Sequence, residues 1–187
     1  MSIRIIAGLR RGAVLQMPEG LDTRPLRDRV RESLFNILRP NLRGARVLDA
    51  FAGSGAVGLE AISRGATWCG FVEAAPPAQE AVRRNIAKLR FERETQLVAG
   101  RSPEAFAKMR VPGDAGVTHV FLMPSYHSGL CWTCLESKEL AALVAEEALA
   151  ICELHREEEV REVPGWEIAD DRLYGITRLM FLQRTKG

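Results

Sequence analysis

The chain has 187 residues, enough for one well-packed domain and a small extension. Hydrophobic residues make up 47% and charged residues 27%, the balance of a globular protein in water, and no apolar run approaches the roughly 18 residues of a membrane span. The first residues also lack the apolar core of a secretory signal, so we expect a cytoplasmic protein without a membrane partner.

The net charge of +2 is unevenly distributed along the chain. Residues 1–46 hold ten arginines against four acidic side chains, a local charge of +6, and the remainder carries a charge of −4. A basic segment made only of arginine favours a polyanionic partner that is held from one end. A solvated helix face crossed by salt bridges is the alternative interpretation.

Residues 1–43 are expected to form an extension that consists of a hairpin and a helix. Residues 4–7 and 13–17 are apolar and flank a basic, glycine-containing turn, which predicts a β-hairpin. Thr23 can cap a helix that begins near Pro25, and its apolar side chains recur on one face. Several arginines surround the start of this helix, where they oppose its dipole, so we expect a ligand to require them.

Residues 44–187 alternate between strand and helix patterns. Strands are predicted at 46–50, 68–73, 95–99, 118–122 and 148–154, and helices at 56–64, 76–90, shortly after 103, and 134–145. Residues 166–169 and 175–184 predict an antiparallel pair around a turn at 170–174. The expected fold class is therefore α/β, a doubly wound, mostly parallel seven-stranded sheet with an antiparallel edge.

A glycine-rich stretch follows the first predicted strand. Gly53, Gly55 and Gly58 have the G-x-G-x-x-G spacing, which lets the backbone approach a ligand at the start of a helix. Asp49 just before them would repel a pyrophosphate but would attract a ligand that carries an ammonium and a sulfonium group. S-adenosylmethionine is such a ligand, and the segment 49–55 resembles the first motif of class I methyltransferases. An ordinary strand-to-helix turn is the alternative.

An acidic residue at the end of the second strand supports the same cofactor. Glu73 follows Gly53 by 20 residues, the distance at which a carboxylate accepts hydrogen bonds from ribose hydroxyls. Ligands of such sheets lie beyond the carboxyl ends of the strands, and residues 100–102 and 123–126 follow two further strands. We therefore expect one pocket to collect all four segments.

The four cysteines are few and irregularly spaced. Cys131 and Cys134 form a single C-x-x-C pair, and a zinc site there would also need His119 or His127. In a reducing compartment we expect free thiols and no metal, with metal or redox use as the alternative.

Motifs throughout the chain resemble those of bacterial 16S ribosomal RNA guanine-N2 methyltransferases, most densely over residues 1–90. They include Arg-Ile-Ile-Ala-Gly at 4–8, Thr-Arg-Pro at 23–25, Asp-Arg-Val-Arg-Glu at 28–32, Leu-Phe-Asn-Ile at 34–37, the loop 49–58, Ser-Arg-Gly-Ala at 63–66, Phe-Val-Glu at 71–73 and Tyr-Gly at 174–175. The resemblance implies a Rossmann-like class I methyltransferase domain at 44–187, S-adenosylmethionine as cofactor, and one guanine of 16S RNA or the 30S subunit as substrate. We expect a monomer.

The resemblance also implies roles for individual residues. The cofactor would be bound by Asp49, Phe51, Gly53, Ser54, Gly55, Glu73, Gly100 and Ser102. Met123, Pro124 and Tyr126 stand at the catalytic positions. RNA phosphates would be contacted by Arg4, Arg10, Arg11, Arg24, Arg27, Arg29 and Arg31, because the planar guanidinium pairs with phosphate through two hydrogen bonds.

Two of these positions depart from the family pattern. The family has Asp-Pro-Pro-Tyr where this chain has Met-Pro-Ser-Tyr at 123–126. A guanine amine becomes nucleophilic when a carboxylate and a backbone carbonyl accept its N–H groups and an aromatic ring stacks on the extruded base. Met123 offers only a thioether, so we expect transfer to be slowed by about 10² to 10⁴. Gly100 replaces an acidic residue that would hold the adenine amino group, for which Ser102 is a substitute.

Three functions remain open at this point. The first is a guanine-N2 methyltransferase that works by direct in-line displacement. The alternative is a catalytically degenerate RNA-binding protein on the same fold, which the altered residues 123 and 125 favour. The third is a methyltransferase for a small molecule or a protein, which leaves the +6 segment unexplained.

Overall fold

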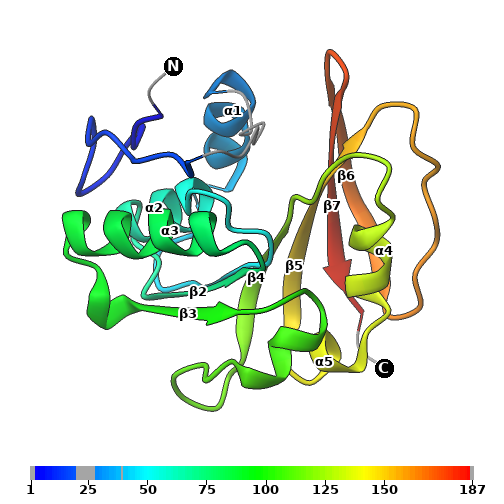
Figure 1. The fold of residues 1–187 in the computed structure, drawn as a ribbon. Coiled ribbons are helices and arrows are strands. Elements are labelled where there is room, and N and C mark those ends of the chain that lie inside the picture. Colours follow the sequence, from blue (N-terminus) through cyan, green and yellow to red (C-terminus); the bar gives the residue numbers. More distant parts are fainter. Residues whose placement is uncertain (1–2, 20–27, 39, 186–187) are drawn as a thin grey trace.

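The structure is a computed structural model that describes residues 3–19, 28–38 and 40–185. One seven-stranded sheet has the order β3-β2-β1-β4-β5-β7-β6 (Figure 1). The strands are β1 (Arg46–Asp49), β2 (Trp68–Glu73), β3 (Thr95–Ala99), β4 (Val117–Leu122), β5 (Val144–His155), β6 (Trp166–Tyr174) and β7 (Thr177–Arg184). The first five pair in parallel, and β7 runs antiparallel to both β5 and β6. This confirms the doubly wound α/β sheet with an antiparallel edge.

Helices cover both faces of the sheet and create two apolar cores. The helices α1 (Asp28–Leu38), α2 (Ala56–Ser63) and α3 (Pro76–Leu89) lie on one face, and α4 (Leu130–Leu135), α5 (Lys138–Ala141) and the 3₁₀ turn η2 (Glu104–Lys108) lie on the other (Figure 1). A further 3₁₀ turn, η1 (Glu92–Glu94), precedes β3. The first core contains Phe35 of α1 against Phe121 of β4, with ring centroids 5.9 Å apart. The N-terminal extension therefore packs into the same core as the sheet.

The helix α3 illustrates how the sequence determines an element. Proline at the first helical positions provides a fixed φ where no backbone donor is needed. The buried side chains, among them Ala78, Val82, Ile86 and Leu89, recur at helical spacing and face the sheet. The helix ends at Arg90, which adopts the left-handed conformation with φ of 59°.

The predicted N-terminal hairpin is present as a chain reversal that pairs through one antiparallel bridge. Arg4 pairs with Val14, and Ile5 N–H donates to the Ala13 carbonyl at 2.9 Å. The turn places Gly8 directly against α2, where a Cβ would lie 1.8 Å from the Ser63 carbonyl oxygen. The predicted helix start near residue 25 lies outside the described residues, and α1 is described from 28 onward.

The prediction of one helix at 134–145 is wrong. Two short helices stand there, and β5 begins at Val144 because this residue pairs with Val117 of β4. Ser137 ends one helix and begins the next, since its hydroxyl donates to the Cys134 carbonyl and accepts from Leu140 N–H. Strand pairing and this capping residue thus override the high helix propensity of an alanine-rich run.

The turn predicted at 170–174 is also wrong. These residues belong to β6, where Asp170 pairs with Phe181 and Tyr174 pairs with Thr177, so the turn itself comprises Gly175 and Ile176. Polar side chains are compatible with an edge strand because one of its faces is exposed to water. Within the described residues, no helix is long and apolar enough to cross a membrane.

Candidate active site

A cavity of about 670 Å³ opens at the carboxyl ends of the parallel strands. One end is lined by residues that follow β1, β2 and β3, namely 50–54, 73–74 and 100–102. The other end is lined by residues 123–126 after β4, by Leu130 of α4 and by Glu153 of β5. The structure therefore brings the four predicted segments together in one pocket, although Asp49 and Gly55 are not among its lining residues.

The glycine loop is held open by left-handed backbone and by one carboxylate. Gly53 and Gly55 have φ values of 55° and 79°, which favour glycine, and α2 starts directly after them. Glu73 accepts from Gly53 N–H at 2.8 Å through Oε2 and from Ala75 N–H at 2.8 Å through Oε1. Glu73 thus orders the loop in addition to lining the cavity. Each of its oxygens has a second lone pair that can accept from a ligand hydroxyl.

Asp49 lies beneath this loop. Its side chain is 2% exposed, and Oδ2 accepts from Gly58 N–H at 3.0 Å near the start of α2. Burial raises the pKa of this carboxyl to about 7, which the hydrogen bond from Gly58 opposes and the charge of Glu73 reinforces. A buried carboxyl of this kind becomes charged most readily beside a cation. The packing of α2 on β2 requires glycine at 58, because a Cβ there would lie 2.4 Å from the Phe71 ring.

The end of the cavity near β3 includes the polar side chain of Ser102. Ser102 is buried, and its hydroxyl donates to the Ala50 carbonyl at 2.6 Å, which leaves the hydroxyl oxygen able to accept. Gly100 donates its N–H to the Glu73 carbonyl at 2.9 Å. Phe51 and Ser54 also line this end. Ser102 can therefore accept a hydrogen bond at this end of the cavity.

The opposite end carries the three predicted catalytic positions. Met123, Pro124 and Tyr126 all line the cavity, and Met123 packs against the first core. The Tyr126 hydroxyl donates to Glu153 Oε1 at 2.9 Å and lies 2.7 Å from Thr177 Oγ1. Sequence reasoning missed Glu153, although an acidic residue near the end of an apolar parallel strand was a signal that could have revealed it.

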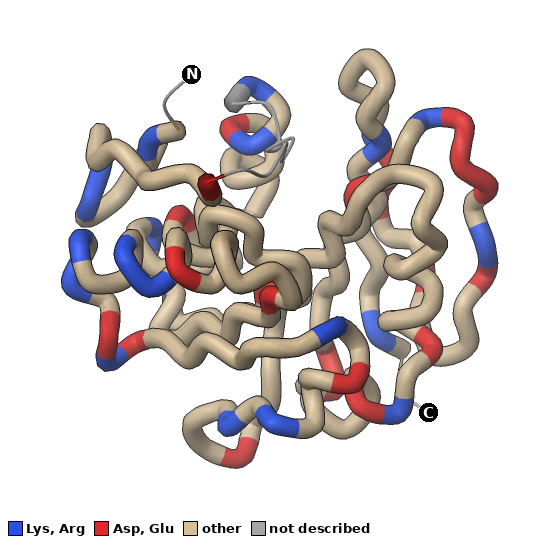
Figure 2. Tube along the Cα trace, viewed as in Figure 1, with Lys and Arg blue, Asp and Glu red and all other residues tan. Residues whose placement is uncertain are grey.

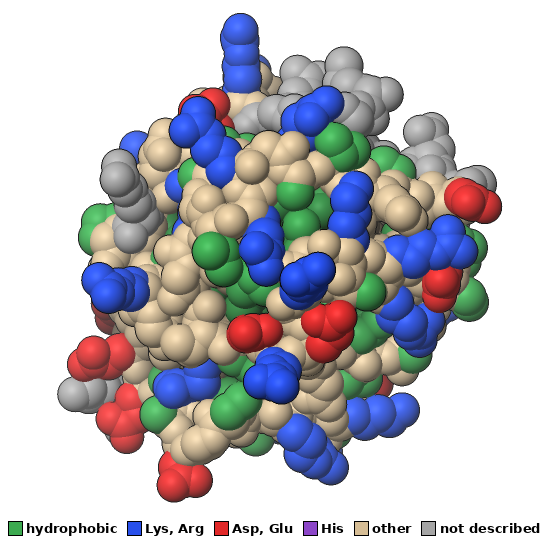
Figure 3. Space-filling model, turned by 90° about the vertical axis from the view of Figure 1, so that its left-hand side faces the viewer, with side chains coloured by type: hydrophobic (Ala, Val, Ile, Leu, Met, Phe, Trp, Pro, Cys, Tyr) green, Lys and Arg blue, Asp and Glu red, His purple; other side chains and the backbone are tan. Residues whose placement is uncertain are grey.

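The predicted RNA-binding arginines fall into different environments. Arg4, Arg11 and Arg29 are exposed, while Arg10 is half-buried and donates through Nε to the Leu89 carbonyl at 2.7 Å. Arg24 and Arg27 lie outside the described residues. Lys and Arg positions occur on the N-terminal reversal and along α3 in Figure 2, and their side chains spread over that side of the molecule in Figure 3. The exposed Arg4, Arg11 and Arg29 are therefore accessible to a polyanion from solvent.

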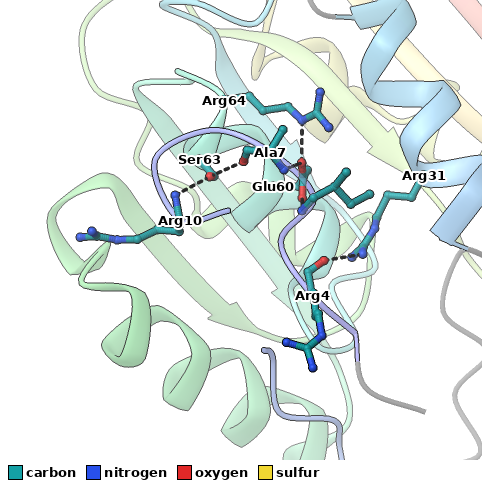
Figure 4. Close-up of polar contacts among 8 residues, drawn as sticks. Arg4, Ala7, Arg10, Arg31, Glu60, Ser63 and Arg64 are labelled. Carbon is teal, nitrogen blue, oxygen red and sulfur yellow. Dashed lines mark hydrogen bonds and ion pairs between the residues drawn. The ribbon is translucent and has the colours of Figure 1, made fainter. Parts of the chain in front are cut away.

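Arg31 differs from the expectation of a surface contact. It is 1% exposed, its Nη2 donates to the Arg4 carbonyl at 2.6 Å, and it lines the cavity (Figure 4). Its position on the buried side of α1 explains the difference, because residues 30, 31, 34 and 35 all face inward. Any contact with RNA would therefore be made from within the pocket.

A buried network that sequence reasoning missed fastens the extension to α2 (Figure 4). The fully buried carboxylate of Glu60 accepts from Ile6 N–H at 2.7 Å and from Ala7 N–H at 3.0 Å, and it pairs with Arg64 at 2.6 Å. Ser63 donates to the Ala7 carbonyl and accepts from the backbone N–H of the reversal at residue 10. An acidic residue within the apolar helix pattern of α2 was the available signal.

A second link runs from the reversal to the glycine loop. The fully buried Asn85 of α3 accepts from Gln16 N–H at 2.8 Å and donates to the carbonyls of Gln16 and Ser54 at 2.9 and 2.8 Å. Met17 of the same segment lines the cavity. The N-terminal extension is therefore part of the wall and the support of the pocket.

The cysteines are buried free thiols. Burial raises the pKa of Cys134 to about 12, and the pKa of Cys131 is raised by its contact with Cys152 and by burial. Among the described residues no group of three or more His, Cys, Asp or Glu side chains could hold a metal ion. Thiols held protonated in this way are poor nucleophiles and poor metal ligands.

Comparisons with known proteins agree with this geometry. A family model described as Conserved hypothetical protein 95 matches residues 3–183. The chain is 34% identical to ribosomal RNA small subunit methyltransferase D of Escherichia coli (strain K12), with 97% of this chain and 90% of the relative covered. It is 30% identical to the protein of the same name in Haemophilus influenzae, with 97% and 93% covered.

Solved structures give the same result for the fold. A protein of Escherichia coli described as a methyltransferase superposes with a TM-score of 0.85 at 31% identity, covering 99% of each chain. A hypothetical protein from Thermus superposes with a TM-score of 0.72 at 32% identity, covering 96% of this chain and 98% of the other. The chain has the fold of class I methyltransferases and belongs to the family described as Conserved hypothetical protein 95.

Proposed function

We propose that the chain is an S-adenosylmethionine-dependent methyltransferase that modifies a guanine N2 amine of 16S ribosomal RNA, with the 30S subunit as its partner in the cytoplasm. One observation carries this proposal: a single cavity joins the loop ordered by Glu73 to Pro124 and Tyr126. The two relatives named ribosomal RNA small subunit methyltransferase D support the substrate class.

The residues at the first end of the cavity fit the cofactor. Gly53 lines the cavity, and a Cβ added there would meet no heavy atom within 4 Å, so this loop borders open space. Glu73 offers acceptor positions to ribose hydroxyls, and Ser102 offers one to an amino group. Asp49 provides a buried negative charge when it ionises, and a volume of about 670 Å³ is within the range of small-molecule sites.

The chain's own residues would position the substrate amine. When bound, S-adenosylmethionine supplies a methyl group on a positively charged sulfur. The Tyr126 ring provides a surface on which an extruded base can stack, and the Pro124 carbonyl can accept one amine N–H. The exposed Arg4, Arg11 and Arg29 would bind phosphates from outside, which suits a polyanionic substrate better than a small molecule.

The test is methyl transfer from labelled cofactor to undermodified 30S particles. We expect incorporation into 16S RNA that depends on the cofactor site, with Glu73→Ala as the control that removes the acceptor carboxylate. Incorporation by the native chain no greater than that by Glu73→Ala would refute the proposed methyltransferase activity. Affinity for RNA that does not change with salt would instead favour a small-molecule or protein substrate, because phosphate contacts weaken steeply as salt rises.

Met123 favours a second candidate, a degenerate RNA-binding protein on the same fold. Its thioether is a very weak acceptor at a position where an amine substrate needs a strong one. Restoring the family motif with Met123→Asp and Ser125→Pro should raise the rate if the motif limits the chemistry. A restored variant that is no faster than the native chain would contradict the degeneration argument.

A further inference from the structure

A carboxylate lies in the same part of the cavity as Met123, near the end of the β4–β5 pairing. The strands β4 and β5 are parallel, and Leu122 pairs with Cys152. Glu153 continues β5 beyond this last pair, and Met123 is the first residue after the end of β4. Both residues line the cavity.

The two side chains also project to the same side of the sheet. Side chains alternate along a strand, so Glu153 of β5 shares its face with Ile151, and Met123, which follows β4, packs against the first core. Phe121 and Ile151 both belong to the first core, which α1, α2 and α3 cover. Glu153 thus offers a carboxylate to the same part of the cavity as the thioether of Met123.

A chain of hydrogen bonds connects Glu153 to the predicted stacking residue. The Tyr126 hydroxyl donates its single proton to Glu153 Oε1 at 2.9 Å, so Thr177, at 2.7 Å, donates to the Tyr126 oxygen. The Tyr126 and His155 rings make an edge contact, with centroids 5.4 Å apart. These contacts hold ring and carboxylate in a fixed relation. An ionised carboxylate can accept several hydrogen bonds at once, so a contact with Tyr126 is compatible with a contact to a ligand.

We propose that Glu153 and Tyr126 form a binding subsite for a base with an exocyclic amine, in which Glu153 accepts the amine N–H that Met123 cannot. The other carboxylate that lines the described cavity, Glu73, lies at the cofactor end and is engaged by the glycine loop. As the amine nitrogen bonds to the methyl carbon, the C–S bond breaks with its electron pair left on sulfur. The amine then loses one proton, which Glu153 accepts and releases to water. The inference rests on the proposed methyl transfer and assigns its missing acceptor.

The test compares Glu153→Gln, Met123→Asp and the double variant in the 30S assay. Glutamine keeps an oxygen for the Tyr126 hydroxyl but loses the charge, so we expect the rate of Glu153→Gln to fall at least about 10²-fold. Cofactor affinity by calorimetry and the melting temperature should stay unchanged. In the double variant, Met123→Asp should raise the rate at least about tenfold above that of Glu153→Gln, because it returns a carboxylate to the same part of the cavity. Glu146→Gln, an exposed change on the same strand, is the matched control.

Two further results separate a direct role from an indirect one. Tyr126→Phe removes the hydroxyl and leaves the carboxylate, so it should cost less than Glu153→Gln; an equal cost would mean that Glu153 only positions the ring. A Glu153→Gln rate within threefold of native, or no recovery in the double variant, would overturn the subsite alone. A native chain that transfers no methyl group would overturn the proposed function together with the subsite.

Discussion

Replacing Asp49 with asparagine should separate stability from cofactor binding. Burial raises the pKa of the Asp49 carboxyl from 3.8 to about 7, so the folded chain keeps a proton that the unfolded chain loses near pH 4. The free energy of unfolding of the ligand-free protein should therefore fall as the pH rises from about 4 to 7, because the folded state binds more protons over that interval. Above pH 7 the full cost of the buried charge is present.

The magnitude follows from the two pKa values. Their difference corresponds to about 4 kcal/mol at pH 8, and the hydrogen bond from Gly58 already contributes to the folded-state pKa. Asparagine has the shape of the protonated acid and can accept the same bond. We expect Asp49→Asn to raise the free energy of unfolding of the ligand-free protein by about 1 to 4 kcal/mol at pH 8, and to give little gain near pH 4. Urea unfolding at both pH values measures this, and Asp114→Asn, an exposed change, should stay within about 0.5 kcal/mol.

Asp49→Asn should also weaken the binding of the cofactor. A carboxyl with a pKa of about 7 is about tenfold more ionised at pH 8 than at pH 6, so native affinity for S-adenosylmethionine should rise by about tenfold over that interval. In Asp49→Asn the affinity should be lower at pH 8 and should not change with pH. Calorimetric titration tests both expectations. A variant that binds as tightly as the native chain at pH 8, or a variant no more stable than native, would refute the role given to this buried charge.

Three further predictions concern the N-terminal extension. Gly8→Ala should destabilise the protein by more than about 2 kcal/mol, since its Cβ would lie 1.8 Å from the Ser63 carbonyl oxygen. Gly12 has nearly the same φ but no heavy atom within 4 Å of its Cβ position, so Gly12→Ala should cost only about 1 kcal/mol of backbone strain. Thermal unfolding of the two variants measures this difference. Arg11→Ser should reduce the slope of log affinity for RNA against log salt by about one phosphate contact, without changing the melting temperature, and an unchanged slope would place RNA elsewhere. Asn85→Ala should lower the free energy of unfolding, measured in urea, by about 2 to 4 kcal/mol. It should also weaken cofactor binding, because the Asn85 hydrogen bonds join the reversal to the glycine loop, and an unchanged cofactor affinity would contradict that link.

Sequence patterns predicted the elements whose residues all favour one structure. In α3 the proline start and the apolar spacing agree, and in the glycine loop the strand, the turn and the acidic residues agree. The helix predicted at 134–145 failed because Val144 pairs with β4, a contact between distant residues that no local pattern contains. The site followed the same rule, since residues 53, 73 and 126 belong to recognisable motifs.

The residues that the sequence concealed are those whose roles depend on contacts across the fold. Glu60 has the appearance of a surface residue in a short helix, but the reversal covers it and gives it two backbone donors. Glu153 becomes a cavity residue only because β4 and β5 pair in one particular register. A register shift of one residue would turn its side chain to the other face of the sheet.

The extension and the pocket form one mechanical unit, which bears on how RNA binding relates to catalysis. Met17 and Arg31 line the cavity, while Asn85 bonds to both the reversal and the carbonyl of Ser54 in the glycine loop. If phosphates bind the exposed arginines of the reversal, they restrict the motion of a segment that is hydrogen-bonded to α2 and, through Asn85, to the loop that would hold the cofactor. An extension of residues 1–43 that only tethered RNA would not need to bury Phe35 in the main core. Substrate affinity and cofactor affinity in this chain should therefore be thermodynamically coupled, each raising the other by the same factor.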